Sequence, residues 1–326
     1  MKRVAILVLL LVVAVSCSEG SETRDGLERV SLRLSWLPGA TFAGDYLAKA
    51  EGLWRKEGLN VELLPGGFEF DSIKLVASGA EDFGVASGPE LLVARANGAP
   101  VVAIGAVIPD SPIGWVSKQE SGITTPEDFV GRRIGAQYGT HTEITLEAMF
   151  AALGLDLESI ERVPVKFDPR PFVIGEIDVL PVYIIDQPVD LRARGISLNV
   201  IDPREYGVAL SFGNVYFTSE KALEERLSVV QAFLRGADAG WERAFEDRDA
   251  AVDALLESAP ELNRDVLRQK IDETFAFVMT GKERYLGVFP MTETEWARTA
   301  ELLQRHGELG EVLVRDVFRP GLIEMR

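Results

Sequence analysis

Four short apolar runs, separated by helix-like segments, place the strongest constraint on the fold. They cover residues 30–36, 61–64, 83–87 and 101–108. The first alternates apolar and polar side chains with the period of a half-buried strand, and the last is continuously apolar, as in a strand buried on both faces. Helical patterns lie between the runs. This alternation predicts an α/β fold with a parallel, doubly wound sheet.

A second set of strands predicts a second lobe. Strand-like runs at 133–137, 162–166, 177–182 and 198–201 again alternate with helical segments. Residues 108–117 contain two prolines and a glycine, which interrupt the alternation of strands and helices. We therefore interpret them as a crossing between lobes, and the strand at 214–218 as the return. We expect residues 30–110 and 217–326 to form lobe 1 and residues 111–216 to form lobe 2. Two lobes joined by two strands make a hinge, and hinged lobes commonly close on a ligand.

The N-terminus has the pattern of an export signal. Lys2 and Arg3 precede an apolar run over 4–15 that is too short to span a bilayer comfortably. The run leads to Cys17, and small residues before this cysteine resemble a bacterial lipobox. We therefore expect residues 1–17 to be a lipoprotein signal segment with Cys17 as the lipidated residue, and the polar residues 18–29 to be a tether. The mature protein would be extracytoplasmic and held to a membrane by lipid.

Composition excludes several functions. The formal net charge of −17 argues against nucleic acid as a partner, because phosphate binding needs a basic face. Cys17 is the only cysteine, and His141 and His306 are the only histidines. We therefore expect no disulfide, no metal site and no cofactor, and a serine triad has no Gly-x-Ser-x-Gly elbow to support it. The sequence predicts no catalytic residue.

The stretch 131–143 is the most promising ligand loop. A short strand leads through Tyr138 and Gly139 into a helix with Thr140 and Glu143 in its first turn. The backbone N–H groups of a first turn lack helical partners, and Gly139 permits close approach. Tyr138 offers a stacking surface and Glu143 an acceptor. A capping box, in which Thr140 caps and Glu143 reaches back, explains the same spacing without a ligand.

Ligands of such sheets collect at the carboxyl ends of strands. Trp36 ends the first strand and offers a surface to a planar heterocycle, although it is also placed to pack against the core. Ser87 and Glu90 follow the third strand. Glu90 is suited to accept from a ring amino or imide group, yet an acidic residue also favours a first turn through the helix dipole. Phe42, on the next helix, and Tyr206 are further stacking candidates.

Several segments carry a family resemblance. They are LSWLP at 34–38, GLWRKEGL at 52–59, and the stretches 79–84, 134–143 and 172–183. Together they resemble the NMT1/THI5-like (SsuA/THI5) family of ABC-transporter solute-binding lipoproteins, over about residues 30–256. The resemblance implies a type-II periplasmic-binding fold that captures a small heteroaromatic compound, with a permease and an ATPase as partners. Segments 164–168, 178–181 and 202–208 are similar to riboflavin-binding members, and other members take thiamine pyrimidine precursors.

The resemblance also bears on individual residues. It favours Tyr138, Thr140 and Glu143 as ligand contacts, and it adds Tyr183 and Asp186, which follow a strand where the family often contacts its ligand. Asp186 is equally suited to cap the next helix.

An enzyme branch of the same family makes thiamine pyrimidine from pyridoxal phosphate and a histidine of the protein. Aligned with that branch, this chain has Ala86 at the lysine position and Glu90 at the histidine position. The branch's cysteine-rich iron motif has no counterpart either. We therefore expect a binding protein rather than an enzyme, with a synthase and a transporter-independent lipoprotein sensor as the alternatives.

Overall fold

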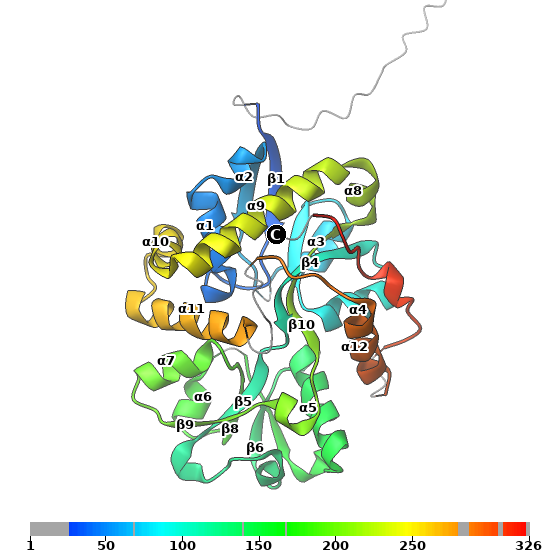
Figure 1. Cartoon of the computed structure of the whole chain (residues 1–326). Coiled ribbons are helices and arrows are strands. Elements are labelled where there is room, and N and C mark those ends of the chain that lie inside the picture. Colours follow the sequence, from blue (N-terminus) through cyan, green and yellow to red (C-terminus); the bar gives the residue numbers. More distant parts are fainter. Residues whose placement is uncertain are drawn as a thin grey trace, which may run out of the picture.

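The computed structural model describes residues 26–67, 69–138, 140–166, 168–279, 287–305 and 309–323. The predicted signal segment with Cys17 lies outside the described residues, as do most of the predicted tether and His306. The described chain forms two five-stranded sheets, each flanked by helices (Figure 1).

The first sheet has the strand order β2-β1-β3-β10-β4. Its strands are β1 (Glu28–Arg33), β2 (Leu59–Leu64), β3 (Phe83–Ala86), β4 (Val101–Asp110) and β10 (Ser211–Ser219). β1 runs parallel to β2 and β3, but β10 runs antiparallel to β3 and β4. The sheet is therefore mixed, and the expectation of a purely parallel sheet was wrong. The reason is that β4 carries the chain out of this lobe and β10 brings it back alongside.

The second sheet has the order β7-β6-β8-β5-β9. Its strands are β5 (Ile113–Lys118), β6 (Arg133–Ala136), β7 (Glu161–Pro164), β8 (Val179–Tyr183) and β9 (Leu198–Ile201). β5 is antiparallel to β8 and β9, so this sheet is mixed as well. The sequence analysis interpreted the region of β5 as a connection, whereas it is a buried strand.

The chain passes between the sheets twice, between β4 and β5 and between β9 and β10 (Figure 1). Only Ser111 and Pro112 separate β4 from β5, close to the predicted boundary after residue 110. On the return, Ser211 already pairs with Asp110 of the first sheet. The second crossing therefore precedes Ser211 and comes earlier than the predicted boundary at 216/217.

Helices cover both faces of each sheet. Those beside the first sheet are α1 (Ala43–Ala50), α2 (Leu53–Lys56), α3 (Ser72–Ala77), α4 (Gly88–Ala96), α8 (Glu220–Glu225), α9 (Leu227–Glu246), α10 (Arg248–Ser258), α11 (Arg264–Val278) and α12 (Glu293–Arg305). Those beside the second are α5 (His141–Leu153), α6 (Arg170–Val173) and α7 (Gln187–Ala193). Short 3₁₀ helices lie at Ala40–Phe42, Gln119–Ser121, Pro126–Phe129, Leu157–Ser159, Pro203–Tyr206 and Val314–Asp316. Separate buried clusters fill the two faces of each sheet, which confirms two doubly wound lobes.

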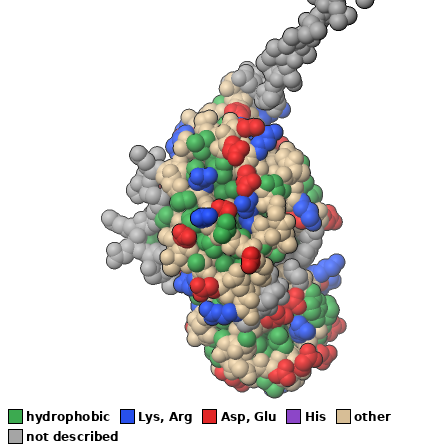
Figure 2. Space-filling view, turned by 90° about the vertical axis from the view of Figure 1, so that its right-hand side faces the viewer, with side chains coloured by type: hydrophobic (Ala, Val, Ile, Leu, Met, Phe, Trp, Pro, Cys, Tyr) green, Lys and Arg blue, Asp and Glu red, His purple; other side chains and the backbone are tan. Residues whose placement is uncertain are grey.

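The long helix α9 lies across α1 (Figure 1). A Cβ atom at Gly240 would lie 2.4 Å from the carbonyl oxygen of Gly44, so the two helices meet backbone to backbone. At the surface, acidic and basic side chains are interspersed on the face shown in Figure 2, and that face carries no basic patch.

A buried carboxyl group lies beneath α9. Asp45 of α1 is fully buried and accepts a hydrogen bond from the Tyr216 hydroxyl, to which the Trp241 indole N–H donates at 2.9 Å. The second carboxyl oxygen of Asp45 has no hydrogen-bond partner among the described residues. Burial raises the pKa of Asp45 to about 7, although the hydrogen bond from Tyr216 opposes the shift.

Asp45→Asn tests this assignment through pH. Because the folded-state pKa lies above the unfolded value, the contribution of Asp45 to stability is complete below about pH 4 and is lost as the pH rises towards 7, at about 1.4 kcal/mol per pH unit. The variant does not titrate and keeps an acceptor for Tyr216. We expect it to gain stability relative to the wild type between pH 5 and pH 7, measured by urea denaturation at several pH values. A pH-independent difference would contradict the assignment.

Candidate functional site

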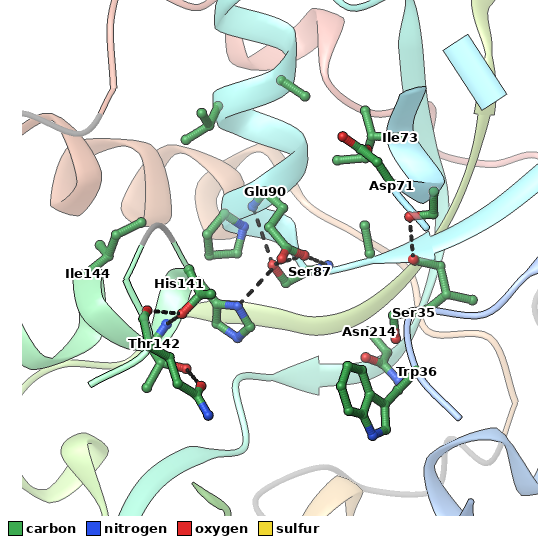
Figure 3. A pocket seen from close by; sticks show the side chains of 18 of the residues that line it. Ser35, Trp36, Asp71, Ile73, Ser87, Glu90, His141, Thr142, Ile144 and Asn214 are labelled. Atoms are coloured by element: carbon green, nitrogen blue, oxygen red, sulfur yellow. Dashed lines mark hydrogen bonds and ion pairs between the residues drawn. The ribbon is translucent and has the colours of Figure 1, made fainter. Parts of the chain in front are cut away.

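A cavity of about 830 Å³ lies between the two lobes (Figure 3). Its walls come from the segments that follow β1, β2, β3, β6 and β8, and from Asn214 of β10. The cavity therefore lies at the carboxyl ends of parallel strands, where the sequence analysis expected ligands. Its volume falls within the range of small-molecule sites.

Trp36 lines the cavity and also packs against the hydrophobic core of the first lobe. Its position depends on Gly66, whose N–H donates to the Trp36 carbonyl oxygen at 2.9 Å. A Cβ atom at residue 66 would lie 2.2 Å from the carbonyl oxygen of Leu34, so only glycine permits this close approach. The two interpretations of Trp36, core packing and cavity wall, are thus compatible.

Ser87 and Glu90 form a complete capping box at the start of α4. The Ser87 hydroxyl accepts from the Glu90 N–H at 3.3 Å, and Glu90 Oε2 accepts from the Ser87 N–H at 2.9 Å. Both residues also line the cavity (Figure 3). The helix-start interpretation is therefore correct for Glu90, and the capping box uses Oε2 and leaves Oε1 outside it.

His141 is the cavity residue that the sequence analysis missed. It is buried at the start of α5, and its Nδ1 lies 3.9 Å from Glu90 Oε1 of the other lobe. Burial lowers the pKa of His141, although the Glu90 carboxylate opposes the shift, so the ring is neutral at pH 7. Its Nε2 and Asn214 Nδ2 are buried without a hydrogen-bond partner in the described part of the chain. A lone histidine carries no sequence pattern, and only its place in the stretch 131–143 pointed to it.

Thr140 and Glu143 line the cavity, whereas Tyr138 does not. Thr140 caps α5 by accepting from the Thr142 N–H at 3.3 Å. Glu143 lies 3.5 Å from the guanidinium of Arg162. Tyr138 is 51% exposed, and its ring also faces Arg162, 5.7 Å from the guanidinium carbon.

Tyr183 and Asp186 both line the cavity from the second lobe. Burial, together with the nearby Glu90 and Asp186 carboxylates, raises the pKa of Tyr183, which keeps its hydroxyl protonated. Asp186 makes no side-chain capping bond to α7. Asp186 does occupy the N-cap position of α7, but its Oδ1 lies 2.6 Å from the Lys270 ammonium instead of bonding to the helix start.

Lys270 joins the two lobes beside the cavity. It extends from α11, which packs on the first lobe, and its ammonium lies 2.6 Å from both Asp186 and Asp190 of the second. Burial alone would lower the pKa of Lys270, but the two carboxylates raise it above its usual range.

Phe42 and Tyr206 do not line the cavity. Phe42 ends a 3₁₀ turn that directs its ring into the first-lobe core, where it is 1% exposed. Tyr206 packs against a core cluster of the second lobe. The structure does not support either residue as a cavity contact.

The family model described as NMT1/THI5 like matches residues 40–251. The chain belongs to the NMT1/THI5-like family. It is 29% identical over 326 residues to the formylaminopyrimidine-binding protein of Halalkalibacterium halodurans, with 98% of each chain covered. It is 26% identical to the riboflavin-binding protein RibY of Chloroflexus aurantiacus, over 87% of this chain and 82% of that protein.

The family also includes enzymes. A 4-amino-5-hydroxymethyl-2-methylpyrimidine phosphate synthase of Legionella pneumophila is 26% identical over 74% of this chain and 77% of the enzyme. Among solved structures, the periplasmic aliphatic sulphonate binding protein SsuA from Escherichia coli matches with a TM-score of 0.71 at 16% identity, covering 91% of this chain and 94% of that one. This similarity confirms the predicted periplasmic-binding fold.

The described residues form no helix that is long and apolar enough to cross a membrane. They also bring together no group of three or more histidine, cysteine, aspartate or glutamate side chains able to hold a metal ion.

Lys270→Met tests the contact between the lobes. The variant leaves Asp186 and Asp190 facing each other without their shared cation, in a site where the lysine side chain is 16% exposed. We expect a loss of about 1–2 kcal/mol in the free energy of unfolding, measured by urea denaturation. Lys221→Met is the control, because Lys221 forms a weak, exposed pair with Glu225 of the same helix, at a distance of 3.8 Å. Equal effects of the two variants would contradict a structural role for Lys270.

Proposed function

We propose that the protein is the extracytoplasmic solute-binding component of an ABC importer and captures a small heteroaromatic compound between its two lobes. The observation that carries this proposal is the cavity, whose walls come from strand ends of both lobes and present Trp36 from one lobe and Tyr183 from the other. A ligand held between two hinged lobes is bound when they close and released when they open.

The chemistry of the wall suits a planar ring with polar edges. Trp36 and Tyr183 provide aromatic surface, and Ser87, Glu90 and Thr140 provide hydroxyl and carboxylate groups at the same cavity. Stacking supplies affinity, while the polar groups select among rings because a mismatched polar atom loses its hydrogen bonds to water without replacement.

A thiamine pyrimidine precursor is our first choice of ligand, and a riboflavin-like compound is the second. The match to the formylaminopyrimidine-binding protein extends over 98% of both chains, whereas the match to the riboflavin-binding protein is shorter. Both ligands are heteroaromatic and carry N–H groups that a carboxylate can accept.

The proposal includes a membrane-held protein. Cys17 would carry the lipid, and residues 18–29 would tether the protein to the membrane. The closed form would dock on a permease that works with an ATPase. A lipoprotein sensor would bind its ligand in the same way, and dependence of uptake on the permease would separate the two roles.

The synthase alternative is disfavoured by two residues of the cavity wall. Ala86 and Glu90 both line the cavity and occupy the positions aligned with the lysine and the histidine of the enzyme branch. The wall therefore offers neither an amine nor an imidazole at these two positions.

A thermal-shift screen tests the proposal. The chain from residue 18 onward is heated with formylaminopyrimidine, 4-amino-5-hydroxymethyl-2-methylpyrimidine, riboflavin, thiamine and an alkanesulfonate. A bound ligand raises the apparent melting temperature by mass action, and we expect this with a heteroaromatic compound. No shift with any heteroaromatic member of the panel would contradict the proposed ligand class.

Trp36→Ala locates the binding. We expect a 10- to 100-fold weaker affinity for the ligand that the screen identifies, because the variant removes the stacking surface. Leu37→Ala is the matched control, since Leu37 is adjacent and exposed and does not line the cavity. Titration by intrinsic fluorescence or calorimetry measures both, and equal affinities of the two variants would place the ligand elsewhere.

A further inference from the structure

The charged side chains of the cavity wall are mostly acidic. The ionisable residues that line the cavity are Asp71, Lys74, Glu90, His141, Tyr183, Glu143 and Asp186. Lys74 is the one lysine or arginine among these lining residues, and its ammonium lies 2.8 Å from Asp71. The Lys74 side chain is 85% exposed, so water screens its charge, and four acidic side chains outnumber it among the lining residues.

Two of the remaining carboxylates have cationic partners. Glu143 lies 3.5 Å from Arg162, and Asp186 lies 2.6 Å from Lys270. Each cation is shared with a second carboxylate, because Arg162 also lies 3.8 Å from Glu147 and Lys270 also lies 2.6 Å from Asp190. Each group of three therefore carries a net negative charge, and its guanidinium or ammonium is already engaged. A negatively charged ligand group would have to compete with these carboxylates for the same cations.

Glu90 differs from the other three carboxylates. Its hydrogen-bond donors among the described residues are neutral, namely the Ser87 N–H at 2.9 Å and the Ser87 hydroxyl at 2.8 Å. Among the described residues, the basic group within 4 Å of it is the His141 ring, which burial keeps neutral. The Glu90 side chain is 45% exposed and extends from the start of α4 towards His141 (Figure 3). Its negative charge is therefore stabilised by the start of α4 but has no cationic partner among the described residues.

The starts of α4 and α5, which both line the cavity, also bear on whether an anion could bind there. A helix N-terminus ordinarily attracts anions through its free N–H groups and dipole. At α4 this position is occupied by the Ser87–Glu90 capping box, and at α5 by the Thr140 cap with Glu143 in the first turn. The start of α4 therefore already holds an internal carboxylate, and the first turn of α5 carries one that lies beside Arg162.

From these observations we infer that Glu90 makes the cavity selective for uncharged or cationic nitrogen heterocycles and against their phosphorylated or sulfonated counterparts. The inference rests on the proposed function and adds a charge rule to it. A phosphate or sulfonate in the closed cavity would lose its hydration and face Glu90 without a counter-ion. A ring amino or imide N–H would instead donate to Glu90 Oε1.

Matched ligand pairs test the charge rule directly. The full-length protein in detergent is titrated by calorimetry with 4-amino-5-hydroxymethyl-2-methylpyrimidine and its phosphate, and with riboflavin and its 5′-phosphate. In a pair whose ring binds, we expect the unphosphorylated compound to bind at least about 100-fold more tightly. Equal or tighter binding of the phosphorylated compound would overturn the charge rule and leave the proposed function standing. Binding of neither member of either pair would overturn the charge rule, and the proposed function would fall with it only if the thermal-shift screen also found no heteroaromatic ligand.

Glu90→Gln tests whether Glu90 causes the preference for the unphosphorylated ligand. Glutamine keeps the capping box but removes the charge, so we expect the affinity ratio within the binding pair to fall about tenfold with the fold retained. Glu257→Gln is the control, because Glu257 is exposed on α10, does not line the cavity and changes the net charge equally. An unchanged ratio in Glu90→Gln, or the same fall in both variants, would overturn the role of Glu90. The wild-type ratio decides the charge rule independently of either variant.

Discussion

The antiparallel insertion of β10 between β3 and β4 is the constraint on which the arrangement of this protein depends. Because β4 leaves the first lobe and β10 returns to it, the two lobes are connected by adjacent strands rather than by a flexible linker. The carboxyl ends of β1 and β3 then face those of β6 and β8 across the cavity. Asn214, on β10 itself, becomes part of the cavity wall.

Contacts across the cavity add a chemical link to this mechanical one. Glu90 meets His141 from the opposite lobe, and Lys270 binds Asp186 and Asp190 from the opposite lobe. Three of these residues, Glu90, His141 and Asp186, also line the cavity. The groups that hold the lobes together are therefore neighbours of the groups that would contact a ligand, so that closure and recognition share the same side chains.

Local patterns in the sequence predicted the parts of this structure that depend on neighbouring residues. Periodicity located β1 and β4, and strand ends led to Trp36, Ser87 and Glu90. The misses involve contacts between distant segments. Proline and glycine masked β5, the 3₁₀ turn directed Phe42 into the core, and Lys270 and His141 gain their roles only when the lobes meet.

The central claim is that one ligand contacts both lobes at once, and hydrogen exchange of the protein with and without formylaminopyrimidine tests it most directly. The account predicts slower exchange at the start of α4 in the first lobe and at the start of α5 in the second, at the same ligand concentration. Protection confined to one lobe, or appearing only away from these two helix starts, would contradict it.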